Sequence, residues 1–486
     1  MLYKRIREMV ENNQESPAIL TDHGEISYRN FLKEVDYLVD FFQKCGLTHE
    51  TPLATVLENN EVTWAVIVAA SFMGVSVMLV DPNLKEEEIN KIRKMYKACY
   101  EIKNITRSDV DEPESNMMYD FECFGNIFYL INIGPASRCW NKYLDLSTKQ
   151  SNIVLLSSGS TKAPFAVVKT MESIVSDGER IGRTLGIKSS DRVLCAAPVY
   201  HAFGAICGCF ATFLHGASVS YTGSFVLPST LENKIQQLSC SVLMALPVHY
   251  KMLVQHAKNP LHQIRIALSS TAPLSNELLQ ACREKLNVNI INIYGSSEAG
   301  GVSIQQNNDN QSSNVGQPIE GVLLRFDDAN YIEIDGKQVG ELIIKSPSLA
   351  KGYLQIEDGG DHEFIIEDGW WRTGDLAYLN EKNELNIVGR LNITINVNGK
   401  KVNPYEIEEV LGKHPAIEDV VVVGQPDSNR GELPVAFIVL KEEVTELELL
   451  QFCRESLSDY KMPRRIEIRD ALPKNSAGKV RRREVK

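Results

Sequence analysis

The sequence lacks an excess of positive charge. In 486 residues, 51 lysines and arginines stand against 63 aspartates and glutamates, which gives a formal net charge of −12. Proteins that bind a nucleic-acid backbone need clustered Lys and Arg, so we expect no nucleic-acid partner. Basic residues cluster only near the C-terminal end, from Lys461 to Arg483. A local cluster on an acidic chain predicts a small anionic ligand or an acidic protein partner.

Metal-binding cysteine patterns and long hydrophobic runs are also missing. The ten cysteines form no Cys-x-x-Cys pair, and Cys207 and Cys209 have no second Cys or His pair nearby. This gives no support to a zinc site and indicates free thiols in a reducing compartment. The longest uncharged apolar run covers residues 64–80 and is divided by Gly74. We therefore predict a buried helix followed by a buried strand, with no membrane span.

The N-terminus has no apolar signal core, and we expect a cytoplasmic protein. Through residues 1–300, short β-branched runs alternate with longer amphipathic stretches, which predicts α/β layers around mostly parallel sheets. Expected helices include residues 28–44, 84–96, 232–238, 248–257 and 276–286. Expected strands include residues 76–80, 128–131, 153–156, 193–196, 219–221, 242–245, 264–268 and 290–294.

The pattern of secondary-structure signals changes twice in the C-terminal half of the sequence. From about residue 302 to residue 388, short strands recur between turn signals, which predicts a small, mainly antiparallel β subdomain. After Gly389 and Arg390 the chain restarts as a compact α+β unit. We predict an α/β fold with a large N-terminal domain over residues 1–389 and a small C-terminal α+β domain over residues 390–486. The large domain is expected to contain two α/β sheets and a small β-barrel-like subdomain.

An ordered set of short motifs carries the candidate chemistry. Residues 155–164 (LLSSGSTKAP) follow a predicted strand, and their hydroxyls and exposed N–H groups suit phosphate oxygens. They form no Walker A loop, because no Gly-Lys-Ser/Thr follows at the required spacing. The later motifs cover residues 198–204, 269–274, 294–298, 340–342 with 352–353, 371–376, 389–390, 399–404 and 473–479.

This set resembles the adenylate-forming superfamily of acyl-CoA synthetases, nonribosomal peptide synthetase adenylation domains and firefly luciferases, from about residue 15 to residue 485. The resemblance implies ATP and Mg²⁺ as cofactors and a mobile C-terminal lid. A carboxylate first attacks the α-phosphate of ATP, giving acyl-AMP and pyrophosphate. The thiol of CoA, or of a carrier-protein phosphopantetheine, then takes the acyl group. Two like charges at ~4 Å repel by about 4 kcal/mol at an effective dielectric of ~20, so the first step needs a bridging cation.

The resemblance also assigns roles to single residues. Glu298 is implied to bind magnesium, Lys479 to contact the carboxylate and ATP from the lid, and His201 to lie at the mouth of the acid pocket. Tyr294 is implied to stack on adenine, Asp375 to accept hydrogen bonds from the ribose hydroxyls, and Arg390 to lie at the ribose and the hinge. The implied ATP site as a whole comprises Ser157, Ser158, Gly159, Ser160, Thr161, Lys162, Thr271, Ala272, Pro273, Tyr294, Gly295, Ser296, Ser297, Asp375 and Arg390.

The resemblance also implies residues for an acid pocket and for a thiol side. Residues expected in the acid pocket are His201, Phe203, Gly204, Leu246, Ser269, Ser270, Gly300 and Gly301, and those on the thiol side are Asn398, Gly399 and Lys400. Amino-acid-activating relatives carry an Asp near the position of His201, which holds the α-ammonium group. Residues 200–202 (Tyr-His-Ala) offer none, so the expected substrate is an acid without an α-amine.

The chain departs from the family pattern at several positions. In the phosphate loop, Lys162 replaces a glycine and Phe165 replaces a lysine. We hypothesise that Lys162 supplies the missing phosphate-binding charge. Ser270 and Thr271 replace two glycines of the acid slot. Near residue 390, Asn392 and Ile393 replace acidic residues, so the chain is interpreted as a specialised member.

Three functions remain open from the sequence. The leading one is an ATP-dependent ligase that joins an aryl or medium-chain acid to CoA. The second is an acyl- or aryl-AMP ligase that loads an acyl carrier protein. The third is a non-catalytic protein that binds a nucleotide or an acyl group. The expected partners are a small carboxylic acid and CoA or the carrier protein, with the chain a monomer or a homodimer.

Overall fold

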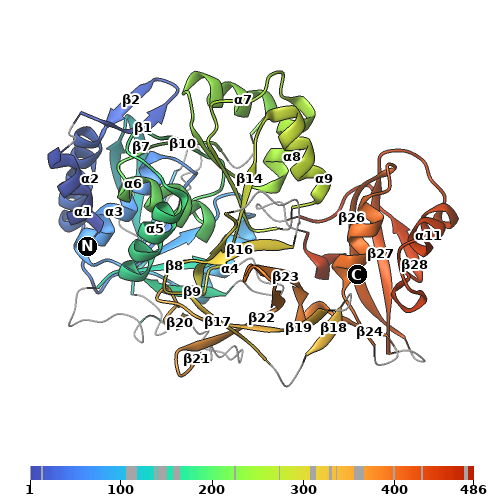
Figure 1. The fold of residues 1–486 in the computed structure, drawn as a ribbon. Helices are drawn as coiled ribbons and strands as arrows, with labels where there is room; N and C mark the ends of the chain where they lie inside the picture. The colour runs from blue at the N-terminus through green and yellow to red at the C-terminus, as the bar shows by residue number, and fades with distance from the viewer. Residues whose placement is uncertain are drawn as a thin grey trace.

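Three β-sheets organise the part of the chain that the structure describes (Figure 1). Two of them form the N-terminal body, and the third lies to one side of it with the C-terminal helices. The structure is a computed structural model. It describes residues 2–12, 15–104, 118–135, 140, 150–156, 165–223, 226–272, 274–306, 313–327, 331–334, 337–354, 366–397, 400–427, 431–474 and 480–485.

The first sheet has eight strands and a parallel centre. The parallel pairs join β8, β4, β3 and β5, while the outer strands on both sides pair antiparallel. In spatial order the strands are β20 (Gly352–Tyr353), β9 (Ala166–Thr170), β8 (Asn152–Leu156), β4 (Val77–Val80), β3 (Leu53–Val56), β5 (Tyr100–Lys103), β7 (Asn126–Asn132) and β6 (Met118–Cys123). The predicted phosphate motif of residues 155–164 begins in β8, and its residues 157–164 stand in the sequence between the adjacent strands β8 and β9.

The longest apolar run of the sequence folds as a helix and a strand, as predicted. Helix α3 (Glu61–Met73) ends at Gly74, whose φ of 76° is readily adopted only by glycine, and β4 follows. Every residue of β4 is buried, and so are nine of the thirteen residues of α3. No helix in the described ranges has the length and apolar character needed to cross a membrane.

The second sheet combines parallel strands with the predicted β subdomain. Strands β11, β10, β12, β13 and β14 are parallel neighbours, and β14 then pairs antiparallel with β15. The path is β17 (Leu323–Phe326), β19 (Lys337–Lys345), β22 (Trp370–Leu379), β23 (Leu385–Arg390), β16 (Asn314–Pro318), β15 (Gly300–Ile304), β14 (Ile290–Ser296), β13 (Ile266–Ser269), β12 (Val242–Ala245), β10 (Arg192–Cys195), β11 (Ser218–Tyr221), β1 (Pro17–Thr21) and β2 (Gly24–Ser27), with β18 (Ile332–Ile334) on β19 and β21 (Ile366–Glu367) on β22.

The β subdomain is therefore continuous with the parallel sheet. Strands β15 and β16 join the two parts edge to edge, and the described strands form no closed barrel. The physical reason is that β14 runs on into an antiparallel hairpin, so its neighbour β15 extends the same hydrogen-bonded ladder. The barrel-like form expected from the short strands is thus an extended sheet edge in the described residues.

Helices cover both α/β sheets. The helix predicted at residues 276–286 is an α-helix that continues as a π-helix and ends at Asn287 in the left-handed conformation. The helices of the N-terminal body are α1 (Leu2–Asn12), α2 (Tyr28–Lys44), α3, α4 (Glu86–Met95), α5 (Met171–Leu185), the π-helix η3 (Gly204–Ala211), α6 (Thr212–Leu214), α7 (Pro228–Gln237), α8 (Pro247–His256), α9 (Asn276–Ala281) and the π-helix η4 (Cys282–Leu286).

The C-terminal part has its own five-stranded sheet and its own core. Apolar residues such as Ile407, Val422 and Ile438 are buried together in it. The sheet order is β25 (Lys400–Val402), β24 (Ile395–Val397), β27 (Gly431–Leu440) and β26 (Ile417–Asp427), with β28 (Arg465–Ile468) parallel to β27. Its helical elements are η6 (Leu391–Ile393), α10 (Pro404–Gly412), α11 (Glu446–Arg454), η7 (Asp459–Lys461) and η8 (Arg482–Glu484).

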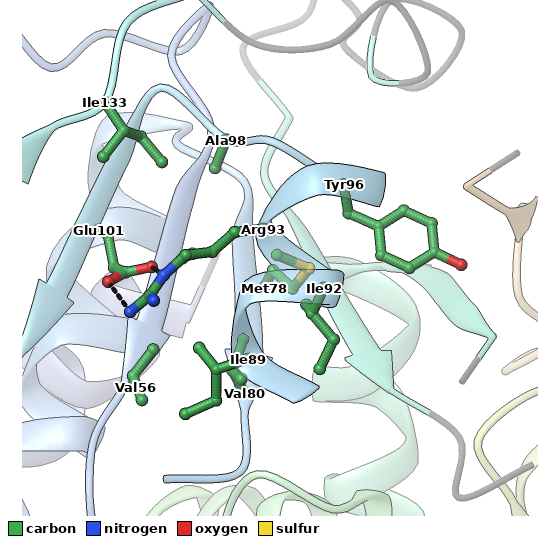
Figure 2. A pocket seen from close by; sticks show the side chains of 11 residues that line it. Val56, Met78, Val80, Ile89, Ile92, Arg93, Tyr96, Ala98, Glu101 and Ile133 are labelled. Atoms are coloured by element: carbon green, nitrogen blue, oxygen red, sulfur yellow. Dashed lines mark hydrogen bonds and ion pairs between the residues drawn. The ribbon is translucent and has the colours of Figure 1, made fainter. Parts of the chain in front are cut away.

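A small cavity lies between α4 and the first sheet. Figure 2 shows its apolar lining and the ion pair at one side, where Arg93 faces Glu101 with two nitrogen–oxygen distances of 2.7 Å. The volume is about 10 Å³, which is space for about one water molecule. This cavity is a packing defect of the first sheet and is too small for an organic substrate.

Candidate active site

The candidate site forms where parallel strands of the second sheet end. Ligands of open α/β sheets bind beside the carboxyl ends of such strands. Strand β13 ends at Ser269, and β14 ends in the segment Tyr294–Ser296. The turn after β14 carries Glu298 and leads into β15. The sheet thus brings the third and fourth predicted motifs together at one edge.

Asp375 is held by two predicted ATP-site residues. The Tyr294 hydroxyl donates to one carboxylate oxygen, and Nε of Arg390 lies 2.7 Å from the other. Asp375 and Arg390 are opposite each other on the paired strands β22 and β23, and Asp375 is only 6% exposed. Burial, and then the Asp375 charge, raises the pKa of Tyr294 well above its usual value, and the Asp375 charge raises the pKa of Arg390. The carboxylate therefore has a fixed orientation.

A bend in β22 sets the position of Asp375. The Thr373 hydroxyl donates to the Leu342 carbonyl at 2.8 Å and accepts from the Asp375 N–H at 2.9 Å. Gly374 has a φ of 72° and donates its N–H to Glu341 at 3.2 Å. A positive φ costs glycine little. The motif at residues 371–376 is therefore a preformed bend that presents the carboxylate.

Glu298 lies on the turn between β14 and β15 and is half-buried. Its Oε1 accepts a hydrogen bond of 3.0 Å from the Tyr353 hydroxyl, and the ring of Tyr353 lies 5.3 Å from that of Phe165. Burial, and then the Glu298 charge, raises the pKa of Tyr353, so this hydroxyl stays a donor. Proteins usually bind Mg²⁺ through one or two carboxylates together with substrate phosphates. A single carboxylate whose partner Tyr353 contacts Phe165, the first described residue after the predicted phosphate loop, fits that chemistry.

His201 is half-buried and follows Tyr200, whose ring lies 5.0 Å away. Burial lowers the pKa of His201, and the negative charge of Asp81 opposes this. Asp81 is held by the Asn83 N–H at 2.9 Å, and Asn83 also donates to the Tyr200 hydroxyl at 3.2 Å. The loop after β4 thus meets the predicted pocket motif of residues 198–204, and the imidazole is favoured in its neutral form.

The segment after β13 keeps a glycine-like backbone despite its substitutions. Thr271 has a φ of 76°, a conformation that a β-branched residue rarely adopts. The Ser270 hydroxyl donates to the Ile293 carbonyl at 2.9 Å and ties the segment to β14, while Ser269 is fully buried. Ala272 is half-buried. The two replacements therefore add hydroxyls to the site edge while the backbone follows the path that glycine would take.

The other predicted pocket residues fall into two groups. Phe203 and Leu246 are buried, and Gly204 packs so closely that a Cβ would lie 2.1 Å from the Pro198 carbonyl oxygen. Gly300 and Gly301 instead face helix α5. A Cβ at Gly300 would lie 2.1 Å from Asp177, and one at Gly301 would lie 2.7 Å from Ile181. These two glycines permit close packing of the turn on α5.

Several predicted site residues lie outside the described residues. They are Ser157, Ser158, Gly159, Ser160, Thr161, Lys162, Pro273, Asn398, Gly399 and Lys479. For Lys400 the structure describes the backbone, in β25. Among the remaining ATP-site residues, Gly295 is exposed and Ser296 and Ser297 are half-buried beside Glu298. The Ser296 hydroxyl accepts the Ala299 N–H at 3.0 Å, which shapes the turn.

Within the described residues, the C-terminal basic cluster is largely neutralised by ion pairs. Arg464 lies 2.9 Å from Asp459, and Lys461, Arg465, Lys474, Arg481 and Arg482 each have an acidic partner as well. The guanidinium of Arg482 meets Glu408 of α10, whose carboxylate also accepts the Val422 N–H of β26 at 2.6 Å. The attraction of this face for an anion is therefore weaker than the count of basic residues predicts. The partners of Lys461, Lys474 and Arg482 are distant in the sequence, whereas those of Arg464, Arg465 and Arg481 lie within five residues.

Sequence reasoning gave no role to two residues around Glu298. Tyr353 lies in the Gly352–Tyr353 motif, which the sequence analysis names without giving the tyrosine a role. Lys169 lies in the apolar strand β9, is fully buried, and lies 3.4 Å from the Glu298 carbonyl oxygen. Burial lowers the pKa of Lys169 to about 8, opposed by the charges of Asp177 and Glu298. A lysine within a strand of buried apolar residues is the signal that could have drawn attention to it.

Comparisons with known proteins agree with this geometry. Residues 6–354 match the family model of the AMP-binding enzymes, and residues 406–479 match that of the AMP-binding enzyme C-terminal domain. A 2-succinylbenzoate–CoA ligase of Listeria monocytogenes is 26% identical, over 99% of this chain and 98% of the relative. The o-succinylbenzoate CoA synthetase of Bacillus subtilis, solved with an acyl-adenylate intermediate, has a TM-score of 0.80 at 21% identity, over 99% of this chain and 97% of that one.

A third similarity extends the agreement to a nucleotide-bound structure. ATP-bound MatB from Rhodopseudomonas palustris has a TM-score of 0.82 at 20% identity, over 100% of this chain and 98% of that one. At this identity the solved structures show a common fold. The family models, by contrast, cover most of the chain, including every motif from the phosphate loop to residue 353. The chain belongs to the family of AMP-binding enzymes.

Proposed function

We propose that this chain is an acid–thiol ligase that converts a carboxylic acid to acyl-AMP with ATP and then transfers the acyl group to CoA. The observation that carries the proposal is the joint placement of Asp375, Tyr294 and Arg390 with Glu298 at one sheet edge. A fixed carboxylate with two oxygens can accept from both hydroxyls of a ribose. The arginine beside it provides a positive charge for the nucleotide.

Each described residue has a defined part in the first step. Asp375 binds and orients the ribose, and Tyr294, which supports it, provides an aromatic face for the adenine. Glu298 would hold Mg²⁺, with Tyr353 fixing one of its oxygens. The metal, when bound, screens the phosphate charges from the incoming carboxylate. His201, favoured in its neutral form, adds no charge to the acid pocket.

The domain boundary at residues 389 and 390 is part of the proposal. The C-terminal part has a separate sheet and core, and the segment from Arg390 to β24 connects it to the site. Rotation of residues 390–486 as a lid would bring Lys479 to the carboxylate and the phosphates for the first step. The thiol side at Asn398, Gly399 and Lys400 would face the acyl-AMP for the second.

The comparisons favour aryl acids as substrates and CoA as the acceptor. Full-length relatives include ligases named for 2-succinylbenzoate and CoA, and a partial match is a 4-coumarate–CoA ligase-like protein of Oryza sativa. Residues 200–202 (Tyr-His-Ala) hold no Asp of the kind that amino-acid-activating relatives carry there, which supports an acid without an α-amine.

The test is acid-dependent release of pyrophosphate over a panel of aryl, medium-chain and amino acids. Each acid is assayed with ATP and Mg²⁺, with and without CoA. We expect release with an aryl acid and conversion to the CoA thioester when CoA is present. If pyrophosphate is released and the acyl-AMP formed with it is not consumed by CoA, the chain uses a different thiol acceptor. Release with amino acids alone would contradict the substrate proposal, and the Asp375→Asn variant serves as the reference with weakened ATP binding.

A further inference from the structure

A buried charge cluster lies directly behind the turn that carries Glu298. Its centre is Lys169 on β9, where the neighbouring residues Ala166, Val167 and Val168 are buried and apolar. The ammonium group of Lys169 donates to the Ser348 carbonyl and lies 3.4 Å from the Glu298 carbonyl. Lysine is almost never fully buried unless it is paired. A role for this lysine must therefore be sought among the groups that it contacts.

Helix α5 supplies the other charges of the cluster. Asp177 is fully buried and lies 3.0 Å from the Arg180 guanidinium. Its second oxygen accepts the Gly301 N–H at 2.9 Å, and Arg180 also donates to the Ser348 hydroxyl at 2.6 Å. The three charged side chains thus hold residues 298–301 and the loop around Ser348 from the side of α5 and β9. Arg180 pairs with Asp177 directly, and the positive charge of Lys169 adds to this pairing.

Glu298 is fixed on both its backbone and its side chain. Its carbonyl oxygen accepts from the Ala350 N–H at 2.7 Å in addition to its contact with Lys169, and its carboxylate accepts from Tyr353. Strand β9 also pairs with β20, which contains Tyr353. The strand that leaves the predicted phosphate loop therefore connects to Glu298 by two routes, one through Lys169 and one through Tyr353.

We propose that Lys169 is a positioning residue that fixes the 298–301 turn, so that the Glu298 carboxylate is presented to the Mg²⁺ of bound ATP. The inference rests on the proposed function and concerns the backbone of residues 298–301, which carries the proposed metal ligand Glu298. Loss of such a supporting partner typically lowers metal affinity or activity by about 10- to 100-fold. We expect the Mg²⁺-dependent part of ATP binding to fall by a factor in this range when the ammonium group is removed.

The test compares three single variants with the wild-type chain. Lys169→Met removes the ammonium group, keeps an apolar side chain of similar length, and leaves Asp177 paired with Arg180. Lys169→Gln keeps an N–H donor on a shorter side chain. The matched control is Lys234→Met in α7, whose ammonium group also donates to a backbone carbonyl, that of Tyr221 at 3.2 Å, and lies 3.1 Å from Asp22.

The readout is the Kd of ATP by calorimetry, measured with excess Mg²⁺ and again with a chelator. The Mg²⁺ ratio, defined as the Kd with chelator divided by the Kd with Mg²⁺, measures how much Mg²⁺ strengthens ATP binding. General damage to the fold would raise both Kd values and leave this ratio unchanged. We expect the ratio to fall about 10-fold or more in Lys169→Met, less in Lys169→Gln, and to be unchanged in Lys234→Met. If Lys169→Met does not fold, the ratio for Lys169→Gln decides.

Two results would overturn the inference in different ways. A full wild-type ratio in a folded Lys169 variant refutes the positioning role and leaves the proposed function intact. A wild-type chain that binds ATP equally well with and without Mg²⁺ refutes the metal role of Glu298, and the inference fails with it. A fall of the same size in Lys234→Met would assign the effect to lost stability and would also contradict a specific role of Lys169.

Discussion

His249 should make the stability of the N-terminal body fall as the pH is lowered. Its Nδ1 accepts the Leu246 N–H at 3.2 Å at the start of α8, and the residue is 5% exposed. Burial lowers the pKa of His249 from 6.5 to about 4. The unfolded chain therefore binds a proton between these values while the folded chain does not. Stability is full above pH 6.5 and is lost as the pH falls toward 4.

The magnitude follows from the two pKa values. Linkage gives a loss in the free energy of unfolding of about 2 kcal/mol at pH 5 and about 3 kcal/mol at pH 4, relative to neutral pH. The substitution to examine is His249→Gln. Glutamine at this third helical position can accept the same backbone N–H without titrating, as in a capping box. We therefore expect this variant to lose about 2 kcal/mol less than wild type between about pH 8 and about pH 5.

The assay is urea unfolding at both pH values, followed by tryptophan fluorescence. All four tryptophans, at positions 64, 140, 370 and 371, precede the proposed lid, so the signal reports on the N-terminal body. His256→Gln, an exposed position on the same helix, controls for the loss of any histidine. Equal losses of stability in wild type and His249→Gln between the two pH values would refute the reasoning.

Three further outcomes are expected. Asp375→Asn removes the charge that aligns both of its partners, so the Kd of ATP measured by calorimetry should rise about 10-fold or more; an unchanged Kd would contradict the ribose assignment. Tyr353→Phe removes the donor to Glu298 and should raise the KM for Mg·ATP about 10-fold in the pyrophosphate assay; an unchanged KM would show that the hydrogen bond is dispensable. Gly208→Ala places a Cβ 2.2 Å from the Cys195 sulfur and should lower the free energy of unfolding by about 1–3 kcal/mol. The added substitution Cys195→Ala should restore most of the lost free energy of unfolding, measured by urea unfolding. If the double variant regains no stability, the clash is not with Cys195.

Much of the local structure could be predicted because its signals lie within a few residues. The run at residues 64–80 folds as predicted because Gly74 ends α3 in a conformation that suits glycine. The strands at residues 153–156, 193–196 and 242–245 are confirmed to within one residue at each end. Hydrophobic periodicity and end signals fix such elements before any tertiary contact forms. The resemblance to the family likewise followed from short motifs, each contiguous in sequence.

What the sequence by itself determined is therefore the order of the elements, the family and the residue types at the site. Only the tertiary structure decided that the β subdomain continues the parallel sheet, that Gly300 packs on α5, and that Arg482 of the basic cluster pairs with Glu408. It also brought Lys169 to Glu298 across 129 residues and Tyr294 to Asp375 across 81. The partner of a buried charge depends on which strands and helices become neighbours. That choice is made by long-range packing and leaves no mark in the local pattern.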